Sequence, residues 1–287
     1  MFGRCIRYMS LPPWWRREGW DPVCEKGGGF IKHFCFTVDD NIRFLKELTE
    51  GEYRSMFQHP YLAMYRRLHD EFGLKIQLNL FFRTEGFDLS MMSAAYYEEW
   101  RKNSDWLKLS FHSERENVKP YENSGYEEVL GDCGRVHEQI LRFASPEALA
   151  KTTTVHYCLL TEEGLRAMGD NRVLGLLGLF GNAESPRTSY GVDESRAERI
   201  RRGEIVKIGT LSFAAIDIVM NRFSTEDILK QLSKMCQREG IRVMIHEQYF
   251  YEDYPRYQPE FEEKLRSVFS YLSENGYKSC FYEDLIL

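Results

Sequence analysis

Two adjacent carboxylates follow the first strand-like run of the chain. Asp39 and Asp40 come directly after the mostly apolar segment 34–38. Neighbouring negative charges at a strand end repel each other, so the pair either lies in water on a turn or is stabilised by a cation. Because Asp is also common at turns and helix N-caps, the pair alone leaves both interpretations open.

Three of the seven histidines also occupy the ends of predicted strands. They are His112, His156 and His246, whereas His33, His59, His69 and His137 fall near a strand start or in helical segments and are interpreted as structural. A single histidine at a strand end is more often a solvated loop residue than a ligand. Four separate strand ends that carry Asp or His side chains therefore favour a shared catalytic or metal site.

A further carboxylate follows the first of these histidines. Glu116 lies four residues after His112, and on a single helical turn both side chains would share one face. Imidazole and carboxylate are both good ligands for zinc. An exposed, charged loop is the alternative interpretation of this stretch.

The elements that must position these residues alternate between strand and helix patterns. Strands are predicted at about Lys32 to Val38, Lys75 to Phe82, Trp106 to Phe111, Thr152 to Tyr157, Val173 to Phe180, part of Ile205 to Ile218, and Ile241 to Ile245. Helices are predicted at Tyr61 to Phe72, Tyr126 to Phe143, Thr225 to Glu239 and Pro259 to Asn275. Strands separated by helices indicate parallel pairing and right-handed crossovers.

About seven such units predict an α/β fold, a distorted (β/α)7 barrel, with an open doubly wound sheet as the alternative. In a barrel the reactive groups lie at the carboxyl ends of the strands, where the Asp and His residues fall. The barrel is expected to be one domain over residues 31–287. Residues 1–30 are rich in Trp, Pro and Gly and predict an irregular N-terminal arm.

Composition excludes several classes of function. A net charge of −6 and the lack of a Lys/Arg-rich run argue against a nucleic-acid partner. No apolar run reaches the roughly 18 to 20 residues of a membrane span, and no signal-peptide pattern begins the chain, so a cytoplasmic protein is expected. The seven cysteines include no Cys-x-x-Cys pair, which argues against a disulfide framework or a zinc knuckle. A small carbohydrate or an acylated small molecule is the expected partner.

At the residues singled out above, the chain resembles the polysaccharide deacetylase family, which is also known as the NodB-homology or carbohydrate esterase family 4 enzymes. Thr37-Val38-Asp39-Asp40 matches the family's Thr-Phe-Asp-Asp signature with one conservative change. The segment 112–116 matches His-Ser/Thr-x-x-His with Glu in place of the last His. Met244-Ile245-His246 stands where a Leu-x-His motif is expected, and the family's Arg-x-Pro motif is absent at the fourth strand.

The resemblance implies a metal-dependent hydrolase that removes an acyl group, N- or O-acetyl, from a carbohydrate-like substrate. It implies that Asp39 is the catalytic base, that His246 is the general acid, and that Asp40 and His112 bind the metal. The third ligand would be Glu116, or His156 in its place. The metal would be divalent, with zinc expected and nickel, cobalt or manganese as alternatives. These roles need Asp39 ionised and His246 protonated at the same pH.

Three residues are predicted to contact the substrate, namely His156, Arg83 and Tyr249. For each of them ordinary packing or a surface ion pair is the competing interpretation. Two other functions remain open. One is a metal-free glycosidase on the same scaffold that uses Asp39 with Glu116 or Glu247. The other is a non-catalytic sugar-binding or regulatory barrel.

Overall fold

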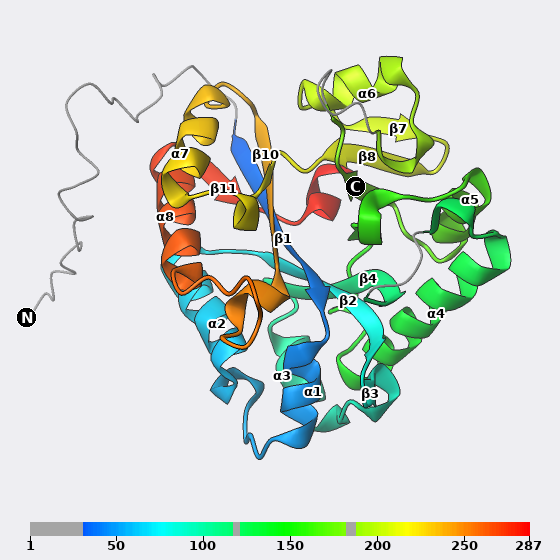
Figure 1. Ribbon diagram of the computed structural model, residues 1–287, viewed down its shortest axis with the longest axis vertical. Coiled ribbons are helices and arrows are strands. Elements are labelled where there is room, and N and C mark those ends of the chain that lie inside the picture. The colour runs from blue at the N-terminus through cyan, green and yellow to red at the C-terminus, as the bar shows by residue number, and fades with distance from the viewer. Residues whose placement is uncertain (1–30, 117–120, 182–187) are drawn as a thin grey trace, which may run out of the picture.

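The computed structural model describes residues 31–116, 121–181 and 188–287 (Figure 1). The predicted arm at residues 1–30 lies outside the described residues. The strands that run parallel to their neighbours are β1 (Lys32–Asn41), β2 (Ile76–Thr84), β4 (Leu107–Arg115), β5 (Thr152–Thr153), β6 (Gly175–Gly178), β8 (Leu211–Ala215), β9 (Ile218–Val219), β10 (Gly240–His246) and β11 (Tyr277–Ser279). The short strands β3 (Phe87–Asp88) and β7 (Val206–Ile208) pair antiparallel to β2 and β8.

These strands form two sheets that together make a distorted barrel. In the first sheet β1 lies between β10 and β2, and β4 follows β2. In the second sheet β6 lies between β5 and β8. A parallel bridge between Leu109 and Leu149 links β4 to the segment that enters β5, and β9, which pairs with β10, follows β8 closely in the chain. The predicted distorted (β/α)7 barrel is therefore confirmed, and the alternative of an open doubly wound sheet is not the fold of this chain.

Helices cover the outside of the strands. They are α1 (Arg43–Glu50), α2 (Pro60–Phe72), α3 (Tyr97–Lys102), α4 (Tyr126–Phe143), α5 (Glu162–Asp170), α6 (Glu194–Arg201), α7 (Thr225–Lys234) and α8 (Phe261–Glu274). Figure 1 shows α2, α7 and α8 along one side of the strands and α4 and α5 along the other. The four predicted helices are confirmed, although α7 ends five residues early. The others are too short for a clear helical periodicity. None of the described helices has the length and apolar character needed to cross a membrane.

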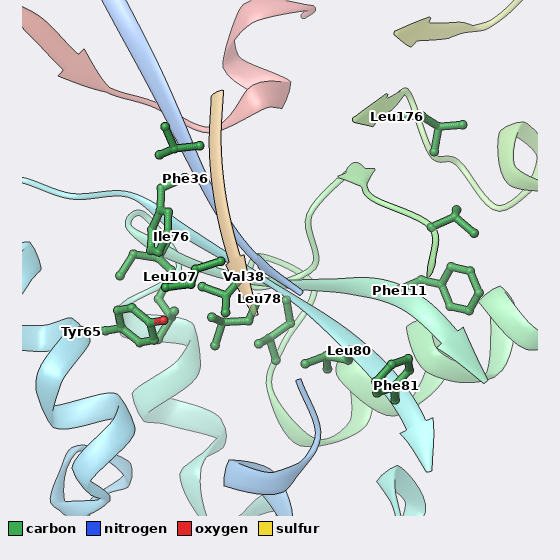
Figure 2. Packing of buried hydrophobic residues seen from close by; sticks show 14 of the residues in the cluster. Phe36, Val38, Tyr65, Ile76, Leu78, Leu80, Phe81, Leu107, Phe111 and Leu176 are labelled. Carbon is green, nitrogen blue, oxygen red and sulfur yellow. The ribbon is translucent and has the colours of Figure 1, made fainter. Parts of the chain in front are cut away.

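In the described part of the chain, the larger of two buried clusters extends from the first sheet to β6 and β8 of the second sheet and to the covering helices (Figure 2). Phe36 and Val38 of β1 and Leu78 of β2 are at most 2% exposed, and the ring centroid of Phe36 lies 5.0 Å from that of Phe269 on α8. Burial of each such side chain stabilises the fold by about 1.5 to 3 kcal/mol. The periodic apolar positions of strands and helices therefore meet in this larger cluster, and a smaller one contains Cys35, Leu177 and Met244.

Two strands of the first sheet carry an extra residue near their carboxyl ends. Between β1 and β2, Val38 pairs with Leu78 but Asn41 pairs with Leu80, so β1 has one residue more than β2 over this stretch. Asp40 lies inside it with a φ of 63°, in the left-handed region. In β4, His112 is the additional residue opposite β2. Such bulges bend a strand and re-aim its side chains.

The β1 bulge is held by the buried side chain of Asn41. Its Nδ2 donates hydrogen bonds to the carbonyl oxygens of Val38, at 2.6 Å, and of Asn79, at 3.1 Å. Its Oδ1 accepts a hydrogen bond of 2.9 Å from the hydroxyl of Tyr61. One amide thus fastens the bulge to β2 and to α2.

The substitution Asn41→Ala should lower the free energy of unfolding by about 2 kcal/mol or more, because it leaves several buried polar groups without a partner. Urea unfolding measures this change. Tyr61→Phe, which removes one hydrogen bond to the same amide and a long one of 3.4 Å from Tyr65, is the matched control and should cost about 1 kcal/mol. Equal losses in the two variants would contradict the assigned role of Asn41.

Candidate metal centre

Three side chains from three strand ends converge at the mouth of the barrel. The Nε2 atom of His112 lies 3.1 Å from Oδ1 of Asp40 and 3.0 Å from Nδ1 of His156. The His156 Nδ1 atom lies 3.3 Å from the same carboxylate oxygen. The ligand atoms of the three residues all fall within 4.8 Å of one another. Asp40 lies in the bulge of β1, His112 is the bulged residue of β4, and His156 lies in the turn after β5.

The His112 ring is oriented as a metal ligand would be, by a hydrogen bond from the nitrogen that faces away from the cluster. Its Nδ1 donates to the carbonyl oxygen of Thr154 at 2.5 Å. In the neutral ring Nε2 then carries a lone pair that faces Asp40 and His156, which is the arrangement of a metal-ligating histidine. Two imidazole nitrogens and a carboxylate oxygen are ligands that zinc and similar divalent ions accept. The residues present therefore fit a divalent metal.

The charges of this cluster are strongly coupled. Burial alone would raise the pKa of Asp40, but hydrogen bonds from His112 and His156 outweigh it and hold the pKa well below its usual range. Burial would lower the pKa of His112, but the charge of Asp39 and the hydrogen bond to Asp40 raise it. For His156 burial prevails and lowers the pKa. The cluster therefore keeps Asp40 ionised.

Asp39 has a different environment from its neighbour. Its side chain is 1% exposed, and Oδ1 accepts a hydrogen bond of 2.7 Å from Nδ2 of Asn79. The Asn79 amide is held in turn by Gln77, whose Nε2 donates to Asn79 Oδ1 at 2.8 Å. Burial raises the pKa of Asp39 to about 6, although the charge of His112 opposes the rise. A carboxylate with a pKa near neutrality is suited to general-base catalysis.

His246 lies next to the acid pair, because β10 pairs with β1 in a register that places it opposite Asp39. Its Nε2 is 3.9 Å from Oδ2 of Asp40, and its Nδ1 donates to Oδ1 of Asn221 at 2.8 Å. Burial lowers the pKa of His246, and the charge of Asp40 only partly opposes this. The carboxylate of Asp40 therefore favours the protonated form of His246, and burial opposes it.

Glu116 does not join the three converging residues. β4 extends through Arg115, so the helical turn expected over residues 112–116 is replaced by strand, and Glu116 is exposed in the turn that follows. Of the two alternatives for a third ligand, the structure brings His156 to Asp40 and His112. Glu116 instead lines a cavity of about 270 Å³ beside Asp40, whose other lining residues include Thr84, Gln248 and Tyr254.

The remaining predicted contacts lie around this mouth. Arg83 is half-exposed and forms an ion pair with Glu114, which is the competing interpretation that the sequence left open. The ring centroid of Tyr249 lies 6.1 Å from that of His246 and 5.1 Å from that of Tyr254. Sequence reasoning did not identify the amides of Asn79, Asn221 and Gln248 as site residues. Their only signal was a polar side chain within a strand, for Asn79, or shortly after one, for Asn221 and Gln248.

No protein-family model and no curated protein sequence matches the chain. Solved structures do match it. An acetyl xylan esterase of family 4 from Clostridium thermocellum, in complex with a cobalt ion, is 11% identical, with 88% of this chain and 90% of that chain covered and a TM-score of 0.50. BA3943, a family 4 pseudoenzyme from Bacillus anthracis, is 11% identical, with 89% and 66% covered and a TM-score of 0.51.

A structure of another class matches as well. A 4-alpha-glucanotransferase from Thermococcus litoralis is 11% identical with a TM-score of 0.59, and the match covers 89% of this chain but only 40% of the transferase. The chain thus spans about two thirds of the pseudoenzyme and less than half of the transferase. Further deacetylases match over about nine tenths of both chains. The chain has the distorted (β/α)7 barrel fold of the carbohydrate esterase family 4 deacetylases, as its sequence motifs predict.

Proposed function

We propose that the chain is a metal-dependent hydrolase that removes an acetyl group, bound through nitrogen or oxygen, from a carbohydrate-like substrate. The observation that carries this proposal is the convergence of Asp40, His112 and His156 beside the buried carboxylate of Asp39. The fold shared with family 4 deacetylases supports it, as does the cobalt ion bound by one of them.

The metal would be held by Asp40, His112 and His156, with zinc as the first choice and nickel, cobalt or manganese as alternatives. A bound divalent ion polarises a carbonyl oxygen and lowers the pKa of a bound water to about 7. Three protein ligands leave positions free for water and substrate. Glu116 lines the neighbouring cavity and is available to contact a substrate.

The protein's own side chains would move the protons. Asp39 takes a proton from the attacking water, since burial brings its pKa to about 6. His246 gives a proton to the leaving amine or hydroxyl from Nε2, the nitrogen that Asn221 does not contact. Because burial lowers the pKa of His246, that proton must be taken up during the reaction, and the charge of Asp40 favours its uptake.

The metal-free glycosidase has less support. Both carboxylate oxygens of Glu247 accept hydrogen bonds from backbone N–H groups, and the side chain is 1% exposed, so this residue is not free to act as acid or base. Of the two acid–base pairs that a glycosidase could use, Asp39 with Glu116 remains and Asp39 with Glu247 does not. The non-catalytic barrel gains support from the fold shared with the pseudoenzyme, and it is an outcome of the first experiment below.

The purified protein should contain about one equivalent of a transition metal by elemental analysis. It should release acetate from N-acetylated glucosamine oligomers or from O-acetylated xylan oligomers. Treatment with a chelator should abolish the release, and added zinc or cobalt should restore it. Bound metal without release of acetate from either substrate would indicate a non-catalytic barrel. Cleavage of the glycosidic bond without metal would indicate the glycosidase.

The two neighbouring acids should respond differently to the same substitution. Asp40→Asn should lose the metal, because it removes the charge that His112 and His156 face. Asp39→Asn should keep the metal and lower kcat by a factor of about 10² to 10⁴, the usual contribution of a general base. Metal content and acetate release are measured on both variants. Equal loss of metal in the two would show that the roles are not divided in this way.

The pH dependence follows from the pKa of Asp39. Its pKa is about 6 without a metal, and a bound cation would lower it, so activity should fall as the pH decreases through 6 or somewhat below. The loss arises because the base accepts a proton only in its ionised form. The profile of kcat/KM against pH measures this acid limb. If Asp39→Asn keeps residual activity with an unchanged acid limb, another group is the base.

A further inference from the structure

Glu247 lies directly after His246 and caps a helix that begins more than two hundred residues earlier in the chain. Its Oε2 accepts hydrogen bonds from the backbone N–H groups of Ile42, at 2.7 Å, and Arg43, at 3.0 Å. Its Oε1 accepts from the N–H of Phe44 at 2.8 Å. The carboxylate therefore satisfies three consecutive donors at the start of α1.

Helix α1 has no cap of its own. The residue at its N-cap is Ile42, whose side chain cannot accept a hydrogen bond, and its first turn contains no acidic residue. The first N–H groups of a helix have no partner within the helix and must find one elsewhere when they are buried. Glu247 supplies that partner and also places a negative charge at the positive end of the helix dipole.

The start of α1 matters because it follows the acid pair without a connecting loop. Asp40 has a φ of 63°, a conformation that non-glycine residues adopt only when their surroundings impose it, and α1 begins at Arg43. The neighbour of Glu247 contacts Asp40 directly, since Nε2 of Gln248 donates to Asp40 Oδ2 at 2.8 Å. The segment after β10 thus holds the chain within the β1 bulge and directly after it.

Other contacts keep Glu247 in place. The hydroxyl of Tyr251 donates to Glu247 Oε1 at 3.1 Å, and the guanidinium carbon of Arg43 lies 3.8 Å from the centroid of the Tyr251 ring. Burial raises the pKa of Glu247 to about 7, while the hydrogen bonds from Ile42, Phe44 and Arg43 oppose the rise. Four hydrogen-bond donors thus surround the two carboxylate oxygens of Glu247 and fix the orientation of its side chain.

We propose that Glu247 is a positioning residue for the metal ligand Asp40. By capping α1 it fixes the backbone two residues beyond the bulge, so that the Asp40 carboxylate points at His112 and His156. Glu247 is not among the side chains that converge on the candidate metal site. The inference rests on the proposed function in one respect, namely that Asp40 is a metal ligand.

The test uses Glu247→Gln in the full-length protein, with Glu283→Gln as the matched control. A carboxamide has one acceptor oxygen where a carboxylate has two. Glu247→Gln therefore leaves part of the N–H groups at the start of α1 without an acceptor, while the shape of the side chain is kept. Glu283 is likewise buried and accepts hydrogen bonds from a backbone N–H, that of Lys151, and from the ammonium group of Lys108. Lys108 is the second residue of β4 and Lys151 directly precedes β5, so this control lies at the opposite end of the strands from the metal cluster.

Three measurements are made on both variants and on the unchanged protein. They are the thermal unfolding midpoint, the Co²⁺ affinity with the visible absorption spectrum of the bound ion, and the exchange of backbone amide hydrogens without metal. Both variants should unfold at a lower temperature. Only Glu247→Gln should bind Co²⁺ about tenfold or more weakly, with a changed spectrum, as expected when the support of a ligand is lost. Only this variant should exchange the amide hydrogens of Ile42, Arg43 and Phe44 faster.

Two results would overturn the proposal. One is a Glu247→Gln variant that is less stable but keeps the affinity and spectrum of the unchanged protein, because the cap would then be structural only. The other is a metal-free crystal structure of this variant in which Asp40 keeps its contacts with His112 and Gln248. If the unchanged protein binds no Co²⁺, the proposed function fails. The crystal structure and the amide exchange then still decide whether Glu247 positions Asp40.

Discussion

The candidate site depends on two bulges, in β1 and in β4, the two strands that flank β2. In a regular strand adjacent residues point to opposite faces, so Asp39 and Asp40 could not both face the barrel mouth. The extra residue in β1 and the left-handed backbone of Asp40 remove this restriction. The extra residue in β4 is His112 itself, which the bulge turns toward Asp40. Two ligands of one site are therefore placed by local departures from the pattern that builds the barrel around them.

Burial and hydrogen bonding then separate the two acids chemically. Both carboxylates are buried, and burial alone raises the pKa of each. Asp40 faces two imidazoles, whose hydrogen bonds outweigh the cost of burial and keep it ionised. Asp39 receives one hydrogen bond from the neutral amide of Asn79, so burial prevails and its pKa rises. The difference between a ligand and a base thus arises from what each side chain contacts, since the two residues are chemically identical.

The barrel and the strand ends could be predicted from the sequence, because apolar periodicity records which residues are buried. The positions of His112, His156 and His246 toward the carboxyl ends of strands followed from the same pattern. The choice between Glu116 and His156 could not be made, because it depends on which strand ends become neighbours when the barrel closes. The roles of Asn41, Asn79 and Asn221 were also beyond reach. A single Asn carries no charge and belongs to no apolar pattern, so its role can be assigned only when its hydrogen-bond partners are known.

The side chains that hydrogen-bond to the cluster from outside include three neutral amides. The acids and imidazoles themselves therefore set the charge of the cluster. Asn79, Asn221 and Gln248 contact Asp39, His246 and Asp40, so none of them offsets a negative charge. With both acids ionised and the imidazoles neutral, the group carries two negative charges that a single divalent cation would cancel. Without a cation, the charge of Asp39 and the hydrogen bond to Asp40 raise the pKa of His112, which favours a proton on Nε2. A metal that binds to Nε2 of His112 must displace that proton, so metal affinity and pH are linked at this residue.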